Sequence, residues 1–446
     1  MTQPRLAIEG GPKAVTGISS APSPKIWIEE LEELLDLWAV KPDAKARIRD
    51  LLLADGIEAP HLFRYYGPQG RSKVEAFEAA AREMFGSRHA LAVNSGTSAL
   101  IAAMVACEVG PGKEVIVPAY TFFATAAAVV VAKAIPVIAE VDETLGLDPH
   151  DVANKITAKT IAIAPVHMGG MPCDMDALMD IAREHNLRVI EDVAQAGGGT
   201  YKGQLLGRFG DMGCFSLDFY KTFVSGEGGL ILTEDEWLYT RAQSYHDTAA
   251  CWRPDRFARE RTPGELFCGE NYRLSELQGA VALAQLRKLP ERLRKWRRNK
   301  QRILKQIEWL EGVSPQPSHD PEGEAAYTLT FYASSPALAK RISEALAAEG
   351  VGAGGMYSSG VRDWHCYRFW EHILEQKTAT AEGCPFTCPY HDAPLPEYSP
   401  EMCPRTLDLL ARAVRLGVAE WWGESDCDLI AGAINKVLRA YLSPPA

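Results

Sequence analysis

Apolar runs alternate with helical stretches through the first half of the chain, and this alternation restricts the fold more than any other feature. The sequence predicts strands at 90–93, 134–141, 161–166 and 187–190, with an amphipathic helix at 175–185. Strand–helix–strand units favour a mostly parallel sheet covered by helices on both faces, so an α/β fold is expected. Sites in such sheets gather beyond the carboxyl ends of the strands.

The stretch 190–230 contains one acid and one lysine at positions that suit a cofactor site. Asp192 follows a predicted strand, and Lys221 lies between an apolar run and a glycine-rich turn. Pyridoxal phosphate needs both groups, because a lysine amine condenses with its aldehyde and a carboxylate keeps its ring nitrogen protonated. Ser216 could then bind the phosphate and Gln195 the ring hydroxyl. Taken alone, however, an acid at a strand end is commonly a helix cap, and most lysines in loops are solvated.

A turn of small residues at 94–98 opens an alanine-rich helix. Free backbone N–H groups and the helix dipole attract an anion there, and Thr97 and Ser98 could add hydroxyl donors. The alternative is an ordinary helix cap. Phe122, in the next strand–turn–helix unit, has a flat face that suits stacking on a ring, but it could also be a core residue.

The central stretch resembles the signature of the DegT/StrS family of sugar aminotransferases, which are fold-type-I pyridoxal phosphate enzymes. The motifs are ED-x-AQA, GD-x-GCFS, a lysine and a GEGG turn, and this chain has each of them. The resemblance implies a large domain with a mostly parallel sheet and a smaller C-terminal α/β domain. It assigns Lys221 to the aldehyde, Asp192 to the ring nitrogen, Gln195 to the ring oxygen and Ser216 to the phosphate.

Other motifs extend the resemblance over most of the chain. It assigns Thr97 and Ser98 to the phosphate and Phe122 to the face of the ring, and it places His167 near the cofactor. In the family, the asparagine of an N-Y-R motif reaches the phosphate of the partner subunit. Asn271 would play that part, which implies a homodimer with shared active sites. From the residues alone, His167 could equally be a turn histidine and Asn271 a helix cap.

The chain of 446 residues is expected to divide into three parts: an N-terminal arm at 1–60, a large cofactor-binding domain at 61–291 and a small C-terminal domain at 292–446. The stretch 351–400 is rich in Gly, Trp, His, Tyr and Pro, as binding loops and long surface excursions both are. Four of its side chains are candidates for the substrate pocket: Trp364, His365, Tyr367 and Tyr390.

Composition excludes several classes of partner. A net charge of -11 argues against nucleic acid and anionic membranes, and the basic cluster at 292–302 has the apolar spacing of a solvated helix face. The uncharged run at 115–132 is interpreted as a strand, a turn and a core helix. The ten cysteines include no CxxC pair, so no metal site is expected. Unpaired cysteines without a signal peptide favour the cytoplasm.

The resemblance implies a transaminase that moves an amino group from glutamate or glutamine to a keto-sugar or keto-cyclitol in amino-sugar or secondary-metabolite biosynthesis. The opening LAI-x-GG-x-P stretch favours a cyclitol acceptor. Two alternatives stay open. One is a dehydratase or aromatising lyase resembling aminohydroxybenzoate synthase, and the other is a non-catalytic regulator that binds the cofactor.

Overall fold

The computed structural model describes residues 5–20, 23–65, 70–252, 255–357 and 360–443. The chain divides into two compact units, Met1–Arg71 and Ser72–Ala446. The first unit contains the short 3-10 helix η1 (Ala7–Glu9) and two helices, α1 (Ile28–Asp36) and α2 (Pro42–Asp55). Exposed ion pairs connect the two helices, among them Lys45 with Asp36 at 2.7 Å. The predicted arm at 1–60 therefore contains a helical pair, and the compact unit to which it belongs extends to residue 71.

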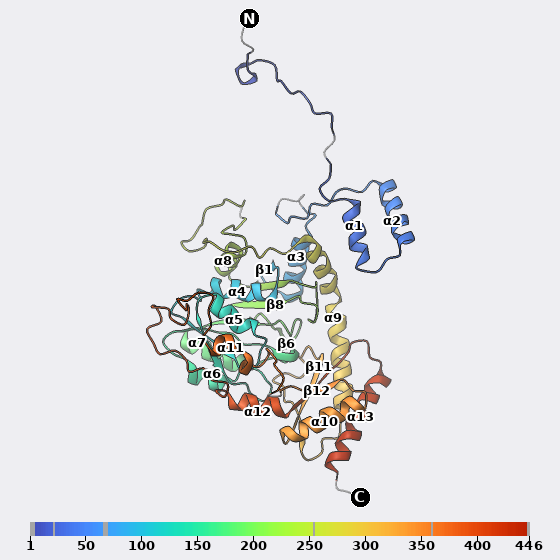
Figure 1. The fold of residues 1–446 in the computed structure, drawn as a ribbon, viewed down its shortest axis with the longest axis vertical. Coiled ribbons are helices and arrows are strands. Elements are labelled where there is room, and N and C mark those ends of the chain that lie inside the picture. Colours follow the sequence, from blue (N-terminus) through green and yellow to red (C-terminus); the bar gives the residue numbers. More distant parts are fainter. Residues whose placement is uncertain (1–4, 21–22, 66–69, 253–254, 358–359, 444–446) are drawn as a thin grey trace. The chain divides into compact units, whose positions relative to one another are not determined.

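The second unit is built on a seven-stranded sheet, which is labelled in part in Figure 1. Its strand order is β1-β9-β8-β5-β4-β2-β3, in which only β9 runs antiparallel to its neighbours. The prediction of a mostly parallel sheet is confirmed. Its strands are β1 (His89–Val93), β2 (Glu114–Pro118), β3 (Ile135–Ala139), β4 (Thr160–Ile163), β5 (Arg188–Asp192), β8 (Met212–Ser216) and β9 (Gly229–Thr233).

Both faces of this sheet are buried, because apolar residues on alternate positions enter two separate core clusters. In β1, for example, Ala92 packs in one cluster while Leu91 and Val93 pack in the other. Helices on the two faces complete the α/β/α layers. The first cluster includes residues of α3 (Lys73–Phe85), α6 (Pro149–Lys155), α7 (Met175–His185) and α9 (Glu276–Leu304), and the second those of α4 (Gly96–Ala106), α5 (Ala124–Val131) and α8 (Glu236–His246).

A second, antiparallel sheet lies later in the sequence, with the order β10-β11-β13-β12. Helix α9 packs on both α3 and α13 and so connects the two sheet regions (Figure 1). The domain boundary predicted at 291/292 falls inside this helix. The remaining elements are β6 (Thr200–Tyr201), β7 (Gln204–Leu205), β10 (Val313–Pro315), β11 (Thr328–Ala333), β12 (Ala353–Gly355), β13 (Ala413–Gly417), α10 (Pro336–Ala348), α11 (Glu371–Leu374), α12 (Pro404–Arg412), α13 (Glu424–Leu442), η2 (Met168–Gly170) and η3 (Tyr367–Phe369).

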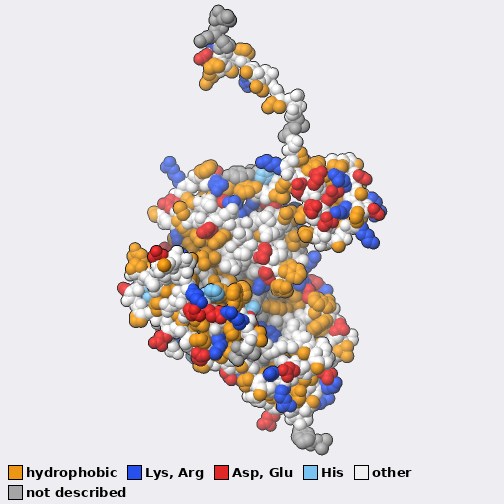
Figure 2. All heavy atoms as spheres, in the orientation of Figure 1, with side chains coloured by type: hydrophobic (Ala, Val, Ile, Leu, Met, Phe, Trp, Pro, Cys, Tyr) orange, Lys and Arg blue, Asp and Glu red, His pale blue; other side chains and the backbone are white. Residues whose placement is uncertain are grey.

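Acidic and basic side chains are interspersed on the face shown in Figure 2. The predicted basic helix face at 292–302 belongs to α9, where several arginines are paired, for example Arg302 with Asp428. None of the helices in the described ranges is long and apolar enough to cross a membrane. The uncharged run at 115–132 forms β2 and α5, as predicted.

Candidate active site

A cavity of about 600 Å³ opens at the carboxyl ends of the parallel strands. The segments that follow β1, β2, β4, β5 and β8 supply most of its wall, as expected for ligand sites in open α/β sheets. The site residues predicted from sequence that line it are Thr97, Phe122, Asp192, Gln195, Ser216 and Lys221. Residues separated by more than one hundred positions therefore meet in one place.

Asp192 ends β5 and is 4% exposed. Its Oδ2 accepts a hydrogen bond from the Thr125 hydroxyl at 2.8 Å, and its Oδ1 accepts one from the Ala194 N–H at 3.0 Å. Burial raises the pKa of Asp192, although these two bonds and the positive charge of Lys221 act in the opposite direction. The result is a buried carboxylate that would be stabilised by a cation beside it.

Glu191 precedes Asp192 in the strand, so its side chain points to the other face of the sheet. It is fully buried and accepts hydrogen bonds from three backbone N–H groups, those of Gly207, Phe209 and Gly210, at 2.7 to 2.8 Å. His167 contacts it at 3.3 Å. The two acids of the ED motif thus differ in role: Glu191 holds the loop before β8, and Asp192 faces the cavity.

Lys221 lies in a tight loop between β8 and β9. Its backbone N–H donates to the Asp218 carbonyl at 3.0 Å, and Asp218 forms a bridge with Gly226, which has a φ of 86°. Glycine readily adopts this left-handed conformation, which explains the glycine-rich turn. Within the part of the chain that the structure describes, the Lys221 Nζ has no hydrogen bond or ion pair. A free amine in a cavity wall is available to a ligand.

The start of α4 forms the anion-attracting corner that the sequence predicts. Ser95 caps the helix, because its Oγ accepts from the Ser98 N–H at 3.0 Å, and Gly96 and Thr97 follow in the cavity wall. Gly96 is required here, since a Cβ atom on it would lie 2.6 Å from the Cβ of Ser216. The close approach brings the N–H groups of α4 beside the Ser216 hydroxyl.

Ser98 lies differently from Thr97. It is buried, its hydroxyl donates to Asn94 Oδ1 at 2.6 Å, and it is not among the residues that line the cavity. The two residues were predicted together as phosphate ligands. The assignment stays a prediction, and the geometry favours Thr97.

Phe122 is 45% exposed, unlike the core phenylalanines, and its ring centroid lies 5.3 Å from that of His365. A large aromatic face exposed inside a cavity suits a flat ligand. Gln195 lies on another part of the wall, where its Oε1 accepts from the Gly169 N–H at 3.0 Å. This bond fixes the direction of the amide.

Two further candidates lie outside the cavity wall. His167 is fully buried, and its Nδ1 accepts from the Cys173 N–H at 3.1 Å while its Nε2 faces Glu191. This is the satisfied turn histidine that the sequence left open. Asn271 is exposed and accepts a hydrogen bond from the Arg273 N–H at 3.4 Å. Its predicted role concerns a partner subunit and stays a prediction.

Of the four loop residues predicted for the substrate pocket, only His365 lines the cavity. The prediction for Tyr367 is wrong, because its ring is fully buried and its hydroxyl donates to the Pro400 carbonyl at 2.8 Å. Trp364 packs against Phe123 instead, with ring centroids 5.6 Å apart. Tyr390 is 74% exposed and is not among the lining residues.

The sequence reasoning missed Thr125 and Tyr327. Thr125 binds the acid, and Tyr327 lines the cavity and donates to Gln195 Oε1 at 3.4 Å. A hydroxyl inside the apolar run at 122–131 was a detectable signal for Thr125. Nothing local marks Tyr327, because it enters the cavity from the segment before β11.

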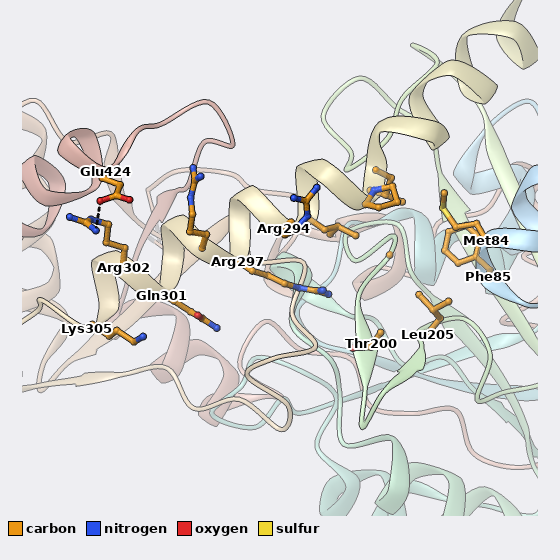
Figure 3. A pocket seen from close by; sticks show the side chains of 15 residues that line it. Met84, Phe85, Thr200, Leu205, Arg294, Arg297, Gln301, Arg302, Lys305 and Glu424 are labelled. Carbon is orange, nitrogen blue, oxygen red and sulfur yellow. Dashed lines mark ion pairs between the residues drawn. The ribbon is translucent and has the colours of Figure 1, made fainter.

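Another cavity, of about 850 Å³, lies along α9 and is lined by several arginines (Figure 3). Its arginines are already engaged within the protein. Arg302 pairs with Glu424 at 2.8 Å, and Arg297 donates to the carbonyl of Glu324 at 2.7 Å. The described residues that line this cavity lack the combination of buried acid, free amine and helix N-terminus found at the sheet edge.

Comparisons with known proteins agree with the geometry. A model of the DegT/DnrJ/EryC1/StrS aminotransferase family matches residues 68–431. The chain is 42% identical over 230 residues to a GDP-perosamine synthase of Caulobacter vibrioides, which covers 50% of this chain and 58% of that protein. It is 35% identical over 372 residues to an L-glutamine:2-deoxy-scyllo-inosose aminotransferase of Streptoalloteichus tenebrarius, with 79% and 83% covered.

Solved structures of similar proteins have the same fold as this chain. A 3-amino-5-hydroxybenzoic acid synthase is 28% identical with a TM-score of 0.68, covering 82% of this chain and 91% of that one. An aminotransferase from Psychrobacter cryohalolentis is 27% identical with a TM-score of 0.70, covering 91% and 98%. The predicted fold-type-I architecture is confirmed. The chain therefore belongs to the DegT/DnrJ/EryC1/StrS aminotransferase family.

Proposed function

We propose that this protein is a pyridoxal phosphate-dependent aminotransferase that transfers an amino group from glutamate or glutamine to a keto-sugar or keto-cyclitol. The observation that carries the proposal is the meeting of Asp192 and Lys221 in one cavity beside the N-terminus of α4. The amino-sugar and cyclitol aminotransferases among the relatives support the reaction class. The chain spans 58% of the length of the GDP-perosamine synthase that it matches, so the substrates named here are part of the proposal.

The residues present fit the cofactor. Asp192 lacks a cationic hydrogen-bond partner among the described residues, and a protonated ring nitrogen would supply one. The Ser95–Thr97 turn and Ser216 would hold the phosphate, where N–H groups and hydroxyls converge. Phe122 offers the exposed face on which the ring would stack. The cavity thus has a separate place for each end of the cofactor.

Pyridoxal phosphate, when bound, supplies an aldehyde that accepts amino groups and a ring that withdraws electrons from the donor's α-carbon. The Lys221 Nζ would hold the aldehyde between turnovers and, once released, move a proton to and from the substrate carbon. Asp192 would keep the proton on the ring nitrogen, and burial makes that ion pair stronger than it would be in water. Thr125 orients the carboxylate for this task.

A second candidate function has support from one comparison. The 3-amino-5-hydroxybenzoic acid synthase is similar over most of the chain, so elimination of water with aromatisation is the competing reaction. A regulator that binds cofactor without turnover is the third reading. The three differ in how the protein responds first to an amino-acid donor and then to an added keto acceptor.

The deciding experiment follows the first half of the reaction, in which the amino-acid donor gives its amino group to the cofactor. Protein reconstituted with pyridoxal phosphate is mixed with glutamate or glutamine, and both the absorbance of the bound cofactor and the keto acid released are measured. Transamination predicts bleaching and one equivalent of keto acid per site. A regulator leaves the spectrum unchanged. Added keto-sugars or keto-cyclitols should then restore the spectrum and yield aminated products by mass spectrometry, whereas a lyase yields an aromatic product.

Lys221 is tested by borohydride reduction followed by peptide mass spectrometry. The cofactor should be fixed to the peptide that contains Lys221, and Lys221→Ala should abolish turnover. Lys288→Ala is the matched control, because Lys288 is exposed and lines only a neighbouring cavity. Appreciable turnover in Lys221→Ala, or labelling elsewhere, would rule out the assignment.

A further inference from the structure

Asp192 is connected to a second threonine, Thr121, through the hydroxyl of Thr125. Thr125 lies in α5, is fully buried, and has its Oγ1 2.8 Å from Asp192 Oδ2. The same hydroxyl oxygen lies 2.8 Å from Oγ1 of Thr121, which is 1% exposed. Both threonines are among the residues that line the candidate active-site cavity. The three side chains thus form a continuous line of hydrogen bonds that ends on the acid.

The direction of these bonds follows from the hydrogens available. Each hydroxyl has one hydrogen to donate, and an ionised carboxylate can only accept. The Thr125 hydrogen therefore points to Asp192 when that acid is charged, because a charge-assisted bond is stronger than a neutral one. The 2.8 Å contact between the two hydroxyls then requires Thr121 to be the donor. Its other possible acceptor, the Phe122 carbonyl, is farther away at 3.3 Å.

The ionisable groups around Asp192 cannot replace this pair of hydroxyls. Lys221, in the loop after β8, and His167, after β4, lower the pKa of Asp192 only while they are positively charged. Lys221 is also the amine proposed to react with the cofactor, so its charge changes during turnover. Cys214 is opposite Asp192 in the register of β8, and burial raises the pKa of this thiol well above its ordinary value. Threonine hydroxyls do not titrate, so their effect on the acid is constant.

We propose that Thr121 and Thr125 form a donor relay that keeps a proton shared between Asp192 and the cofactor's ring nitrogen on the nitrogen, an inference that rests on the proposed function. Burial favours the transfer of that proton to the carboxylate, because the transfer turns two charged groups into two neutral ones. Donors aimed at the carboxylate stabilise its charged form and oppose the transfer, and a chain of hydrogen bonds strengthens its last member. Thr121 is thus a positioning residue that acts through Thr125.

The first measurement uses the full-length apoprotein, so it does not depend on the proposed function. The ionisation of Asp192 is followed by NMR of protein labelled at the aspartate carboxyl carbons, and Asp192→Asn identifies its signal. Thr125→Val keeps the shape of the side chain without the donor, so the acid ionisation constant of Asp192 should fall about tenfold. Thr121→Val should cause a smaller fall in the same direction. Thr125→Ser and Thr121→Ser retain the hydroxyls and should keep the wild-type constant.

The second measurement locates the proton in the holoenzyme. Protein is reconstituted with pyridoxal phosphate labelled at the ring nitrogen, whose NMR signal differs between its protonated and neutral forms. Wild type and the two serine variants should show the protonated form, whereas Thr125→Val should shift toward the neutral one. Thr233→Val is the matched control, because the Thr233 hydroxyl is also buried but donates to the Asp211 carbonyl at 2.7 Å, and Thr233 does not line the cavity.

The serine variants separate the relay from simple packing. If they lower the ionisation constant of Asp192 as much as the valine variants do, the loss comes from packing and the inference is wrong. Valine variants that leave the ionisation constant or the nitrogen signal unchanged would also overturn it. A wild-type protein that binds no pyridoxal phosphate would instead refute the proposed function, whatever the titration of the apoprotein shows.

Discussion

Asp192 and Glu191 are adjacent carboxylates whose side chains lie on opposite faces of β5. They differ in how well hydrogen bonds from the protein stabilise their negative charges. Glu191 receives three backbone N–H donors and is satisfied within the protein. Asp192 receives two donors and is buried enough that its pKa is raised. The first carboxylate stabilises a loop, whereas the second is costly to ionise until a cation arrives. Single substitutions should separate these roles.

Asp192→Asn should maintain or raise the stability of the apoprotein while it weakens the stabilisation by bound cofactor. A folded-state pKa above the unfolded value means that ionisation of Asp192 opposes folding, and the loss grows as pH rises from the unfolded value through the folded one. At pH 8 the apo form of Asp192→Asn should therefore unfold at a temperature equal to or above that of wild type. Adding pyridoxal phosphate should stabilise wild type far more than the variant.

Thermal unfolding of both proteins at pH 8, with and without cofactor, checks this expectation. Turnover by Asp192→Asn should fall steeply even at saturating cofactor, because the ring nitrogen loses its partner. An apo variant markedly less stable than wild type would show that the raised pKa does not govern stability here.

Glu191→Gln should lower the free energy of unfolding, and it should not act directly on the reaction. An amide nitrogen would replace one carboxylate oxygen and face a backbone N–H, so a buried donor would lose its acceptor. The expected loss in free energy of unfolding is about 2 to 3 kcal/mol. Urea denaturation measures it, with exposed Glu83→Gln as the control. A loss no greater than the control's would mean that the loop is held by other contacts.

At the scale of elements, the site depends on α4 packing directly on the end of β8. Gly96→Ala should push the helix away, because the new Cβ would lie 2.6 Å from Ser216 Cβ. Overpacking of this kind costs about 1 to 3 kcal/mol, and the phosphate corner should lose affinity for pyridoxal phosphate. Gly110→Ala is the control, since nothing lies within 4 Å of its added Cβ.

The double variant Gly96→Ala/Ser216→Gly distinguishes the clash from other causes. Removing the Ser216 side chain should restore part of the lost unfolding temperature of the apoprotein, since the Ser216 Cα would still lie 3.1 Å from the added Cβ, but it should not restore the affinity for the cofactor. If Gly96→Ala alone binds the cofactor normally, the corner does not hold its phosphate.

The parts of the site that could be predicted from sequence are those carried by single elements. The order of apolar runs predicts the parallel sheet, and Asp192, Lys221 and Thr97 follow from it because each comes directly after a strand or opens a helix. Tyr327 could not be found in this way. It lies beside a second sheet whose packing against the first depends on tertiary contacts, and nothing in its local sequence distinguishes it from a strand residue. The prediction that Tyr367 lines the substrate pocket is wrong because a segment rich in aromatic residues can belong to a core as well as to a pocket.

At the scale of the whole molecule, the resemblance predicts a homodimer in which Asn271 completes the site of the partner. Asn271 is exposed and is not among the residues that line the candidate active-site cavity of its own subunit. Asn271→Asp keeps the size of the side chain and its bond to the Arg273 N–H, but adds a negative charge where the partner's phosphate would lie. We expect this variant to lose cofactor affinity and activity.

Mixing inactive variants tests the sharing of sites. In a dimer of one Lys221→Ala chain and one Asn271→Asp chain, one site carries both defects and the other carries neither. Random exchange of subunits in a symmetric dimer should therefore restore about one quarter of wild-type activity. Refolding the two variants together, with each refolded alone as the control, measures the gain. If every site were built from one chain, the mixture would show only the mean of its parents, because no exchange of subunits could then assemble an intact site.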